Sequence, residues 1–230
     1  MNLKTIAHIR NMYKEKFGIP RQSGMTDMVS KIVFEKEFRD INALRGLEGF
    51  SHLWLIWGFS KNGEDGDEPF RPTVRPPRLG GNTRVGVFAT RSPFRPNPLG
   101  LSSVRLKQIT ETDEGPVIEV LGADLLDGTP IYDIKPYLAS FDCHSDAKSG
   151  FVDEKEFRVL RVILSDEHKA VLGPDAAILE QTLSQDPRPQ YQDDPSRVYG
   201  MHFSDYVIRF TVRGDVLTVL EVSRVSPEAR

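Results

Sequence analysis

Short apolar segments at close spacing constrain the fold of this chain more than any other feature of its sequence. Each segment is continuously apolar or alternates apolar with polar side chains, and Gly, Pro, Asn and Asp mark its ends, as is typical of β-strands. The sequence between the segments is too poor in helix for repeated βαβ crossovers. A mainly antiparallel barrel or sandwich is therefore predicted, with strands at residues 3–10, 31–38, 53–59, 84–90, 101–109, 117–121 and 131–134.

Two neighbouring stretches depart from simple alternation. Residues 53–59 are apolar throughout, which predicts a fully buried strand. Residues 40–46 instead place Ile41 and Leu44 at helical spacing, which predicts one or two turns of helix at most. His52 adjoins the apolar run and is interpreted as a hydrogen-bonded strand residue, not as a metal ligand.

The composition changes after Tyr137, which indicates a second folding unit. Residues 139–150 are small and polar, as in a linker. Helix signals follow in residues 165–185, where Ser165 can cap the first turn and the Gly173-Pro174 pair can interrupt the helix. Strands are expected at residues 156–164, 201–212 and 216–225. The expected organisation is a single-sheet antiparallel β-barrel domain at residues 1–145 and a small α+β domain at residues 150–230.

Composition and apolar patterning are those of a globular protein of a reducing compartment. Hydrophobic residues make up 39% of the chain and charged residues 27%, unlike the profile of a disordered chain. The longest apolar run, residues 53–59, is far below the roughly 20 residues needed to cross a bilayer. Residues 1–16 lack the apolar centre of a secretory signal. Because Cys143 is the single cysteine, an internal disulfide is impossible, and a cytoplasmic location is expected.

The cysteine and histidines indicate neither a thiol nucleophile nor a metal centre. Cys143 would need a nearby base, and the side chain of His144, its neighbour in sequence, can rarely point at the same substrate. The other histidines show no His-Glu-x-x-His spacing and have no cysteine cluster near them. No metal site is therefore predicted.

Basic side chains are concentrated in one segment, although the chain has a formal net charge of -3. Residues 70–108 contain no Asp or Glu. A patch of one sign attracts phosphate or carboxylate, and a guanidinium can also stack on a nucleobase. These properties favour nucleic acid as the partner, and the alternative is a network of arginines paired with acids elsewhere in the fold. The basic residues are Arg71, Arg75, Arg78, Arg84, Arg91, Arg95, Arg105 and Lys107.

Prolines and glycines in this segment predict stiff loops without a nucleotide fold. The six prolines between Pro72 and Pro98 fix backbone angles and would hold the arginines in place. The glycine pair at residues 80–81 fits neither Gly-x-Gly-x-x-Gly nor the phosphate-binding P-loop, and no helix signal follows it. A kinase or dehydrogenase nucleotide site is not expected.

The same segment carries a long motif, which reads RPTVRPPRLGGN at residues 71–82 and GVFATRSPFRPNP at residues 86–98. Five shorter motifs occur in the rest of the first unit: YKEKF at 13–17, PRQ at 20–22, LRGLE at 44–48, DGTP at 127–130 and DIKPY at 133–137. Over the whole first unit, this set of motifs and its order along the chain resemble the TsaA-like family. In the second unit, QDPRP at 185–189 and nearby Tyr191 resemble the C-terminal signature of the bacterial tRNA methyltransferases in that family.

The resemblance implies a single-sheet β-barrel that binds S-adenosylmethionine (SAM) without a Rossmann fold. It also implies a homodimer with cofactor sites near the subunit boundary, for which Trp54 and Trp57 offer apolar surface as core or contact. The implied reaction is methylation of N6 of N6-threonylcarbamoyladenosine at position 37, in the anticodon loop, of threonine tRNAs. Neither DNA nor a membrane is an expected partner.

Matching the motifs residue by residue gives the expected contacts. Ser23 stands where the family commonly has proline, and Ser60 stands where histidine is common, so contacts at these two positions would use the backbone. The expected tRNA contacts are Arg71, Arg75, Arg78, Arg188 and Tyr191. The expected cofactor contacts are Gln22, Ser23, Gly24, Ser60, Lys61, Arg91, Arg95, Leu101, Asp127, Gly128, Thr129 and Pro130.

The implied chemistry needs alignment more than it needs a reactive side chain. Methyl transfer from a sulfonium requires no metal. The acceptor nitrogen must lose its proton, and Asp127 or Asp133 could accept it, although the sequence assigns no catalytic residue. Anticodon-loop bases can splay out onto arginine or aromatic faces. Two alternatives stay open: a tRNA-binding module without catalysis, and an enzyme that clamps anionic metabolites with arginines.

Overall fold

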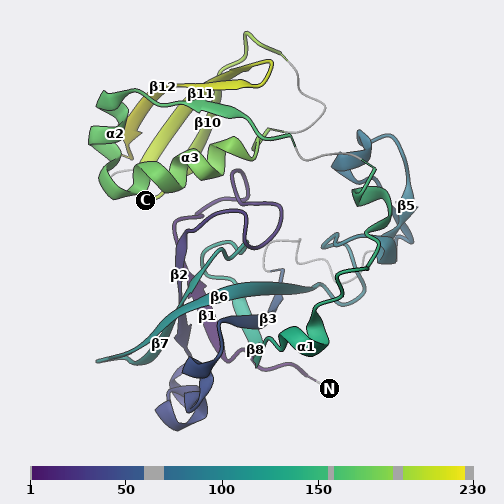
Figure 1. Cartoon of the computed structure of the whole chain (residues 1–230), viewed down its shortest axis with the longest axis vertical. Helices are drawn as coiled ribbons and strands as arrows, with labels where there is room; N and C mark the ends of the chain where they lie inside the picture. The colour runs from purple at the N-terminus through teal and green to yellow at the C-terminus, as the bar shows by residue number, and fades with distance from the viewer. Residues whose placement is uncertain (1, 60–69, 155–157, 189–193, 226–230) are drawn as a thin grey trace.

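The first of the two larger β-structures among the described residues is a closed barrel of six antiparallel strands, in the order β1-β2-β7-β6-β3-β8 (Figure 1). The computed structural model describes residues 2–59, 70–154, 158–188 and 194–225. The mainly β fold predicted from the sequence is thereby confirmed, as a barrel and not a sandwich. Its strands are β1 (Ala7–Arg10), β2 (Val29–Phe34), β3 (His52–Gly58), β6 (Leu99–Thr112), β7 (Gly115–Leu121) and β8 (Pro130–Pro136).

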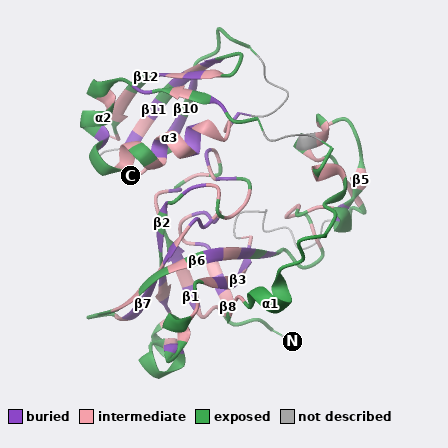
Figure 2. Ribbon diagram, viewed as in Figure 1, coloured by how far each residue is buried: buried purple, intermediate pink, exposed green. Residues whose placement is uncertain are grey.

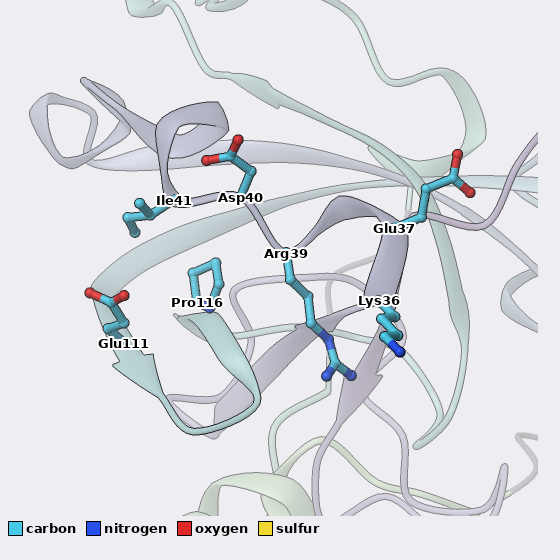
Figure 3. A pocket seen from close by; sticks show the side chains of 7 residues that line it. All are labelled: Lys36, Glu37, Arg39, Asp40, Ile41, Glu111 and Pro116. Carbon is cyan, nitrogen blue, oxygen red and sulfur yellow. The ribbon is translucent and has the colours of Figure 1, made fainter.

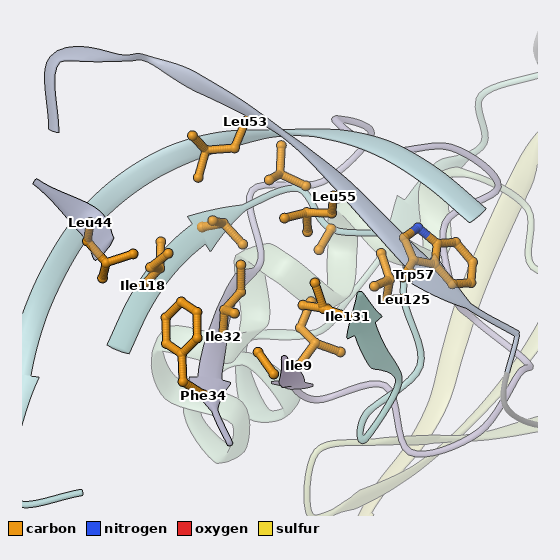
Figure 4. Close-up of a cluster of buried hydrophobic side chains, with 14 residues drawn as sticks. Ile9, Ile32, Phe34, Leu44, Leu53, Leu55, Trp57, Ile118, Leu125 and Ile131 are labelled. Atoms are coloured by element: carbon orange, nitrogen blue, oxygen red, sulfur yellow. The ribbon is translucent and has the colours of Figure 1, made fainter. Parts of the chain in front are cut away.

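Inward-facing side chains meet in register across the barrel. Ile32 of β2 lies opposite Ile9 of β1 and opposite Ile118 of β7, and all three are fully buried. Figure 4 shows Trp57 at one end of this cluster and Leu44 at the other. Burying one such aliphatic side chain contributes about 1.5–3 kcal/mol. A slip of one residue would turn this whole face outward, so the register is fixed by the core.

Strand β3 differs from its prediction in one respect. Leu53, Leu55 and Trp57 are buried, but Trp54 and Ile56 between them are only partly buried. The expectation of a fully buried strand is therefore wrong, because only one face of each strand in a barrel meets the core. The ring of Tyr137 lies against the outward-facing Trp54, with 5.5 Å between the ring centroids.

The arm, which we define as residues 70–98, extends to one side of the barrel around β5 (Figure 1). It contains a two-stranded sheet of β4 (Thr73–Val74) and β5 (Val85–Gly86), with the 3-10 helices η4 (Pro77–Leu79) and η5 (Val87–Ala89). The strand expected at residues 84–90 is thus reduced to two residues. Prolines lack the N–H that a β-ladder requires, and they flank β4 on both sides, so the ladder cannot grow.

Short helices occupy the connections of the barrel. The segment predicted as one or two helical turns at residues 40–46 contains η2, whose cap is Asp40, with its side chain accepting from the N–H of Asn42. The polar stretch after β8 includes α1, which is exposed (Figure 2). These elements are η1 (Lys36–Phe38), η2 (Ile41–Leu44), η3 (Leu47–Gly49), α1 (Ala139–Asp142) and η6 (Gly150–Val152).

The second β-structure is a four-stranded sheet in the order β10-β11-β12-β9, in which β9 runs parallel to β12. Its strands are β9 (Arg161–Ile163), β10 (Tyr199–Phe203), β11 (Tyr206–Arg213) and β12 (Val216–Arg224). Helices α2 (Asp166–Leu172) and α3 (Ala176–Ser184) are separated by η7 (Gly173–Asp175), as the Gly173-Pro174 pair predicts. The Ser165 hydroxyl caps α2 by accepting from the N–H of His168 at 3.2 Å. The small α+β unit predicted from the sequence is confirmed.

Two strand boundaries were not predictable from alternation alone. Residues 201–212 form two strands instead of one, because the chain turns at Ser204, whose φ is 55°. The alternation shifts phase there, because the buried positions are odd-numbered up to Phe203 and even-numbered from Tyr206, so the Ser204-Asp205 pair was a turn signal that the prediction overlooked. The strand expected at residues 3–10 begins only at Ala7. Within the described residues, no helix has the length and apolar character needed to cross a membrane.

Shortening Ile32 tests the barrel core. Ile32→Ala removes a fully buried side chain between Ile9 and Ile118 and leaves a cavity, so it should lower the free energy of unfolding by about 2–5 kcal/mol. Val29→Ala on the same strand, where the side chain is 36% exposed, should change it by less than about 0.5 kcal/mol. Urea denaturation of both variants measures the difference. Equal losses would show that Ile32 is not a core position.

Candidate functional site

A cavity of about 550 Å³ lies where the barrel, the arm and the segment after β1 meet. Trp54 and Trp57 of β3 contribute aromatic surface, and Leu99, Gly100 and Leu101 come from the start of β6. Residues 19–22 and the end of the arm supply most of the polar groups. Its volume is within the range of about 300–1,000 Å³ typical of small-molecule and cofactor sites.

A second cavity, of about 420 Å³, lies at the other end of β2 and has different properties (Figure 3). It mixes acids and bases, and its side chains already serve local structure. Asp40 caps η2, and the Arg39 Nε donates to the carbonyl of Phe34 at 2.9 Å. None of the predicted site residues lines it, so it is not the candidate site. Its lining consists of Lys36, Glu37, Arg39, Asp40, Ile41, Glu111 and Pro116.

The structure brings many of the predicted cofactor contacts to the larger cavity. Five of them line it, namely Gln22, Arg91, Arg95, Leu101 and Thr129. Five others adjoin these in sequence without lining the cavity: Ser23, Gly24, Asp127, Gly128 and Pro130. Ser60 and Lys61 lie outside the described residues. Segments from three distant parts of the sequence thus converge on one cavity.

Asp124, which the sequence interpretation missed, is the one acid among the described residues that line this cavity. The Trp57 Nε1 donates to the Ser102 hydroxyl at 3.0 Å, and that hydroxyl donates to the Asp124 carboxylate at 2.5 Å. Burial raises the pKa of Asp124, and the hydrogen bond from Ser102 and the charge of Arg91 offset this only in part. The sequence did contain a signal for Asp124, namely an acid inside the otherwise apolar stretch 121–126. Burying a carboxyl without partners costs folding free energy, so an acid in such a stretch suggests a special role.

Glycine contacts place the loop of Gln22, Ser23 and Gly24 beside this carboxyl. The N–H of Gly24 donates to the carbonyl of Gly122 at 2.8 Å. Gly122 has a φ of 78°, and a Cβ there would stand 3.0 Å from backbone atoms of Gly24, so only glycine fits. The backbone of Ser23 forms a hydrogen bond with the Asp124 carboxylate.

Arg91 and Arg95, the two arginines of the arm that were predicted as cofactor contacts, have different roles. The Arg91 guanidinium donates to the side-chain oxygen of Gln22 and so connects the arm to the loop. The Arg95 guanidinium donates to the carbonyls of Val87 at 3.1 Å and Thr90 at 2.6 Å, and lies 5.5 Å from the ring centroid of Phe88. Arg95 therefore stabilises the backbone conformation of the arm and also lines the cavity.

The acids considered as proton acceptors are engaged elsewhere. One Asp127 oxygen accepts from the N–H of Asn11 at 2.9 Å, and the other accepts from the Lys14 ammonium at 2.8 Å. Asp133 is half exposed, pairs with Lys135 at 2.9 Å and does not line the cavity. Neither carboxylate lines the cavity, and both already have local partners, so the geometry favours neither Asp127 nor Asp133 as the proton acceptor.

The residues expected to contact tRNA differ in their exposure to solvent. Arg71 and Arg75 are exposed on the arm, Arg78 belongs to η4, and Tyr191 lies outside the described residues. The Arg188 side chain is only 3% exposed and forms a two-pronged ion pair with Asp186, at 2.8 and 2.9 Å. This pairing raises the pKa of Arg188. In this structure the Arg188 guanidinium is thus engaged with Asp186 and is not presented at the surface.

The alternative of basic side chains paired with acids holds within the described residues at Lys107, which pairs with Glu119 at 3.1 Å, and at Arg105. Arg105 pairs with Asp27 at 2.8 Å. Across the described part of the chain, no group of three or more His, Cys, Asp or Glu side chains is placed to hold a metal ion. The site is therefore built from aromatic, amide and guanidinium groups around one partly buried carboxyl, Asp124.

Comparison with known families identifies the family of both parts of the chain. The tRNA-methyltransferase O N-terminal domain matches residues 8–143, and the C-terminal domain of the same family matches residues 159–225. The chain belongs to the tRNA-methyltransferase O family. The family resemblance predicted from the motifs is thus confirmed, and both β-structures of this chain fall within the matched ranges.

Individual relatives resemble the chain over nearly its full length. An Escherichia coli tRNA (adenine(37)-N6)-methyltransferase is 39% identical over 217 residues, or 90% of this chain and 91% of the relative. A Pseudomonas aeruginosa protein described as a candidate SAM-dependent methyltransferase is 40% identical over 232 residues, or 96% of this chain and 97% of the relative. A crystal structure of TrmO from Pseudomonas aeruginosa superposes with a TM-score of 0.77 at 34% identity, covering 98% of this chain and 97% of the other.

Removing the Ser102 hydroxyl tests the polar chain at the cavity. Without that donor the Asp124 carboxylate loses stabilisation, so Ser102→Ala should raise the pKa of Asp124 above its already raised value. The folded protein then keeps a proton that the unfolded chain releases, and stability should fall over a wider window as pH rises above the ordinary carboxyl pKa. NMR titration of the Asp124 carboxyl carbon and pH-dependent urea denaturation measure both effects.

The matched control is Ser103→Ala, on the opposite face of the same strand. It should leave the pKa of Asp124 as in the wild type. A lower pKa of Asp124 in Ser102→Ala would contradict the donor role of the hydroxyl.

Proposed function

We propose that this protein transfers a methyl group from SAM to N6 of N6-threonylcarbamoyladenosine at position 37, in the anticodon loop, of threonine tRNAs. The observation that carries the proposal is the convergence of Gln22, Arg91 and Thr129 with a buried carboxyl, Asp124, on one cavity of cofactor size. Family membership and the names of relatives support SAM-dependent methyl transfer to adenosine 37 of tRNA. The threonylcarbamoyl group and the restriction to threonine tRNAs are our extension.

The lining of the cavity fits a sulfonium cofactor. Trp54, Trp57 and Phe59 present aromatic rings, which attract a cation and can stack on an adenine. Gln22 and Thr129 offer hydrogen bonds that can orient polar ends. When bound, SAM supplies a methyl group activated by the positive sulfur. The protein has to hold this group in line with the acceptor nitrogen.

Asp124 is suited to accept the proton that the nitrogen loses. As the nitrogen forms its bond to the methyl carbon, the bond from that carbon to sulfur breaks, and the N6 proton must leave. A buried carboxyl with a raised pKa is a stronger base than an exposed one. The Ser102 hydroxyl keeps one carboxylate oxygen engaged. Asp124 replaces Asp127 and Asp133 as the candidate base.

The arm is suited to bind the anticodon loop. Its described part has exposed Arg71, Arg75 and Arg84, and the rings of Phe70 and Phe88 are stacked with centroids 6.1 Å apart. Phe88 is 69% exposed, which leaves an aromatic face for an unpaired base. Phosphate attraction and base stacking together favour a single-stranded RNA loop over duplex nucleic acid.

We further propose two domains, a barrel at residues 1–145 that binds cofactor and a small domain at residues 150–230, in a cytoplasmic homodimer. Leu101 and Phe94, which are 57% and 65% exposed at the cavity rim, are apolar surface that a second copy could cover. Trp57 is not part of that surface because it belongs to the barrel core.

A methyl-transfer assay tests the function. The purified full-length protein should add one methyl group to threonylcarbamoyladenosine in tRNA from a strain lacking the gene, as detected by mass spectrometry of the nucleosides. Tight tRNA binding without SAM binding or methyl transfer would instead indicate a binding module without catalysis. Weak, nonspecific tRNA affinity with turnover of an anionic metabolite would indicate the small-molecule enzyme.

In the same assay, Asp124→Asn tests the proposed base. The wild-type rate should rise with pH as the Asp124 carboxyl loses its proton, in a range above the ordinary carboxyl pKa because burial raises it. The variant should be slower by about 100-fold or more and should lack that rise. Its SAM affinity, measured by calorimetry, should be nearly unchanged. A loss of SAM affinity with an unaltered pH profile would assign Asp124 to cofactor binding instead.

Arg75→Ala tests the arm. Removing one phosphate contact should weaken tRNA binding and flatten its salt dependence by roughly one counterion, while the SAM affinity stays constant. Arg213→Ala, an exposed arginine in the β11–β12 hairpin, is the control and should change neither. Light scattering checks that the oligomeric state is preserved. An unchanged salt slope in Arg75→Ala would remove Arg75 from the tRNA surface.

A further inference from the structure

The segment between β1 and β2, residues 11–28, has no helix or strand, although all of it is described. Its course therefore depends on tertiary contacts. Toward the barrel it supplies Gln22 and Arg21 to the cavity. Toward the C-terminal sheet it supplies Met12 and Phe17, which pack against the core of that sheet. Figure 1 shows the loops of this segment rising from the barrel toward α3.

Gln181 of α3 holds the end of this segment. Its side-chain oxygen accepts from the N–H of Asp27 at 2.7 Å, and its nitrogen donates to the Asp27 carboxylate at 3.2 Å. The same carboxylate accepts from Arg105 of β6 at 2.8 Å. Asp27, three residues after Gly24, thus joins α3 of the C-terminal unit to β6 of the barrel.

The ion pair of Asp186 and Arg188 holds the middle of the segment. Asp186 has a φ of 50°, a conformation that side chains other than glycine seldom adopt, and the Arg188 fork fixes its carboxylate there. This orientation presents the Asp186 carbonyl to Arg21, whose Nη2 donates to it at 3.1 Å. The Arg21 carbonyl in turn accepts from Gln22 at 2.6 Å, and Gln22 accepts from Arg91.

A third contact is buried and involves Tyr13, near the start of the segment. The Tyr13 hydroxyl lies 3.2 Å from the Thr26 hydroxyl and also bonds the hydroxyl of Thr182 on α3. Tyr13 is 2% exposed, and both threonines are buried. The segment is therefore tied to the C-terminal unit at both ends and in the middle, while its other side forms the cavity wall.

We propose that the C-terminal unit positions the cofactor-binding segment, with Gln181, Asp186 and Arg188 as positioning residues for SAM binding. A loop held in its binding conformation does not have to be ordered when the ligand binds, so the affinity for the ligand increases. Loosening these contacts should then weaken SAM binding in the absence of any RNA. The inference rests on the proposed function, because it names SAM as the ligand of this wall.

The experiment uses the full-length protein and SAM alone as the first probe. Gln181→Ala and Arg188→Ala should each weaken SAM binding by about three- to tenfold, the effect of one or two hydrogen bonds, in calorimetry without tRNA. The dissociation constant for tRNA and its salt dependence should stay within about twofold of the wild type. Turnover at saturating SAM should be nearly retained, while the KM for SAM rises, because the segment can still be ordered by the cofactor.

Arg209→Ala is the matched control. It removes an arginine of the same unit whose ion pair with Glu221 is exposed, so SAM binding should equal that of the wild type. If Arg188→Ala does not fold, Gln181→Ala carries the test, because its bonds to Asp27 lie at the surface.

Two outcomes would overturn the inference. Unchanged SAM affinity in Gln181→Ala would show that the contact does not position the segment. Weaker tRNA binding with a flatter salt slope and constant SAM affinity in Arg188→Ala would restore Arg188 as a phosphate contact. Absence of SAM binding in the wild type would instead contradict the proposed function, so the two failures are distinguishable.

Discussion

Closure of the barrel between β1 and β8 is the constraint on which the candidate site depends. The seam has only two paired positions, Ala7 with Ile131 and His8 with Pro130. It continues as irregular backbone bonds, from Ile9 to Thr129 at 3.1 Å and from Gly128 to Ile9 at 2.9 Å. The last of them runs from the Asp127 N–H to the Tyr13 carbonyl at 2.8 Å. The same bonds that close the barrel therefore set the start of the segment that forms the cavity wall.

The buried carboxyl beside this seam exchanges stability for reactivity. In water an aspartate is a weak base at neutral pH, because its pKa is low. Burial of Asp124 raises that pKa and so improves its basicity, but the folded state then has to bury a charge at neutral pH. The hydrogen bond from Ser102 limits this cost without removing it, since one donor offsets burial only in part. An apolar residue at this position would avoid that cost but could not accept the proton in the proposed reaction.

Properties that come from a repeating pattern or a local motif could be predicted from this sequence, whereas properties that depend on the folded environment of a residue could not. Strand alternation predicted the barrel strands and the second sheet, and the glycine-proline pair predicted the interruption between α2 and α3. The turn at Ser204 was missed because the prediction treats residues 201–212 as one alternating run, although the phase of alternation shifts at the polar pair Ser204-Asp205. Motif matching predicted residues such as Gln22 and Arg91 that converge on the cavity. The role of Asp124 was not predictable, because a pKa depends on burial that only the folded chain creates.

Arginine illustrates the same limit, because its role is decided by what surrounds it. Arg75 is exposed on the arm, Arg95 holds backbone carbonyls of the arm, and Arg188 is buried against Asp186. In sequence all three stand in proline-rich motifs, from which Arg75 and Arg188 were predicted as tRNA contacts and Arg95 as a cofactor contact. Removing Arg188 would leave Asp186 as an uncompensated, largely buried charge, a loss of about 3–5 kcal/mol for pairs of this kind.

The resemblance of a motif to a binding signature does not by itself show that its members touch the ligand. Asp186 and Arg188 act on each other, and the backbone conformation that they fix presents one carbonyl to Arg21. Arg21 lines the cavity, so the effect of the motif reaches the site through one hydrogen bond of 3.1 Å. On the positioning role proposed above, loss of such a residue should change cofactor affinity before it changes the affinity for RNA. The position of the C-terminal unit beside the segment after β1 gives this motif its function.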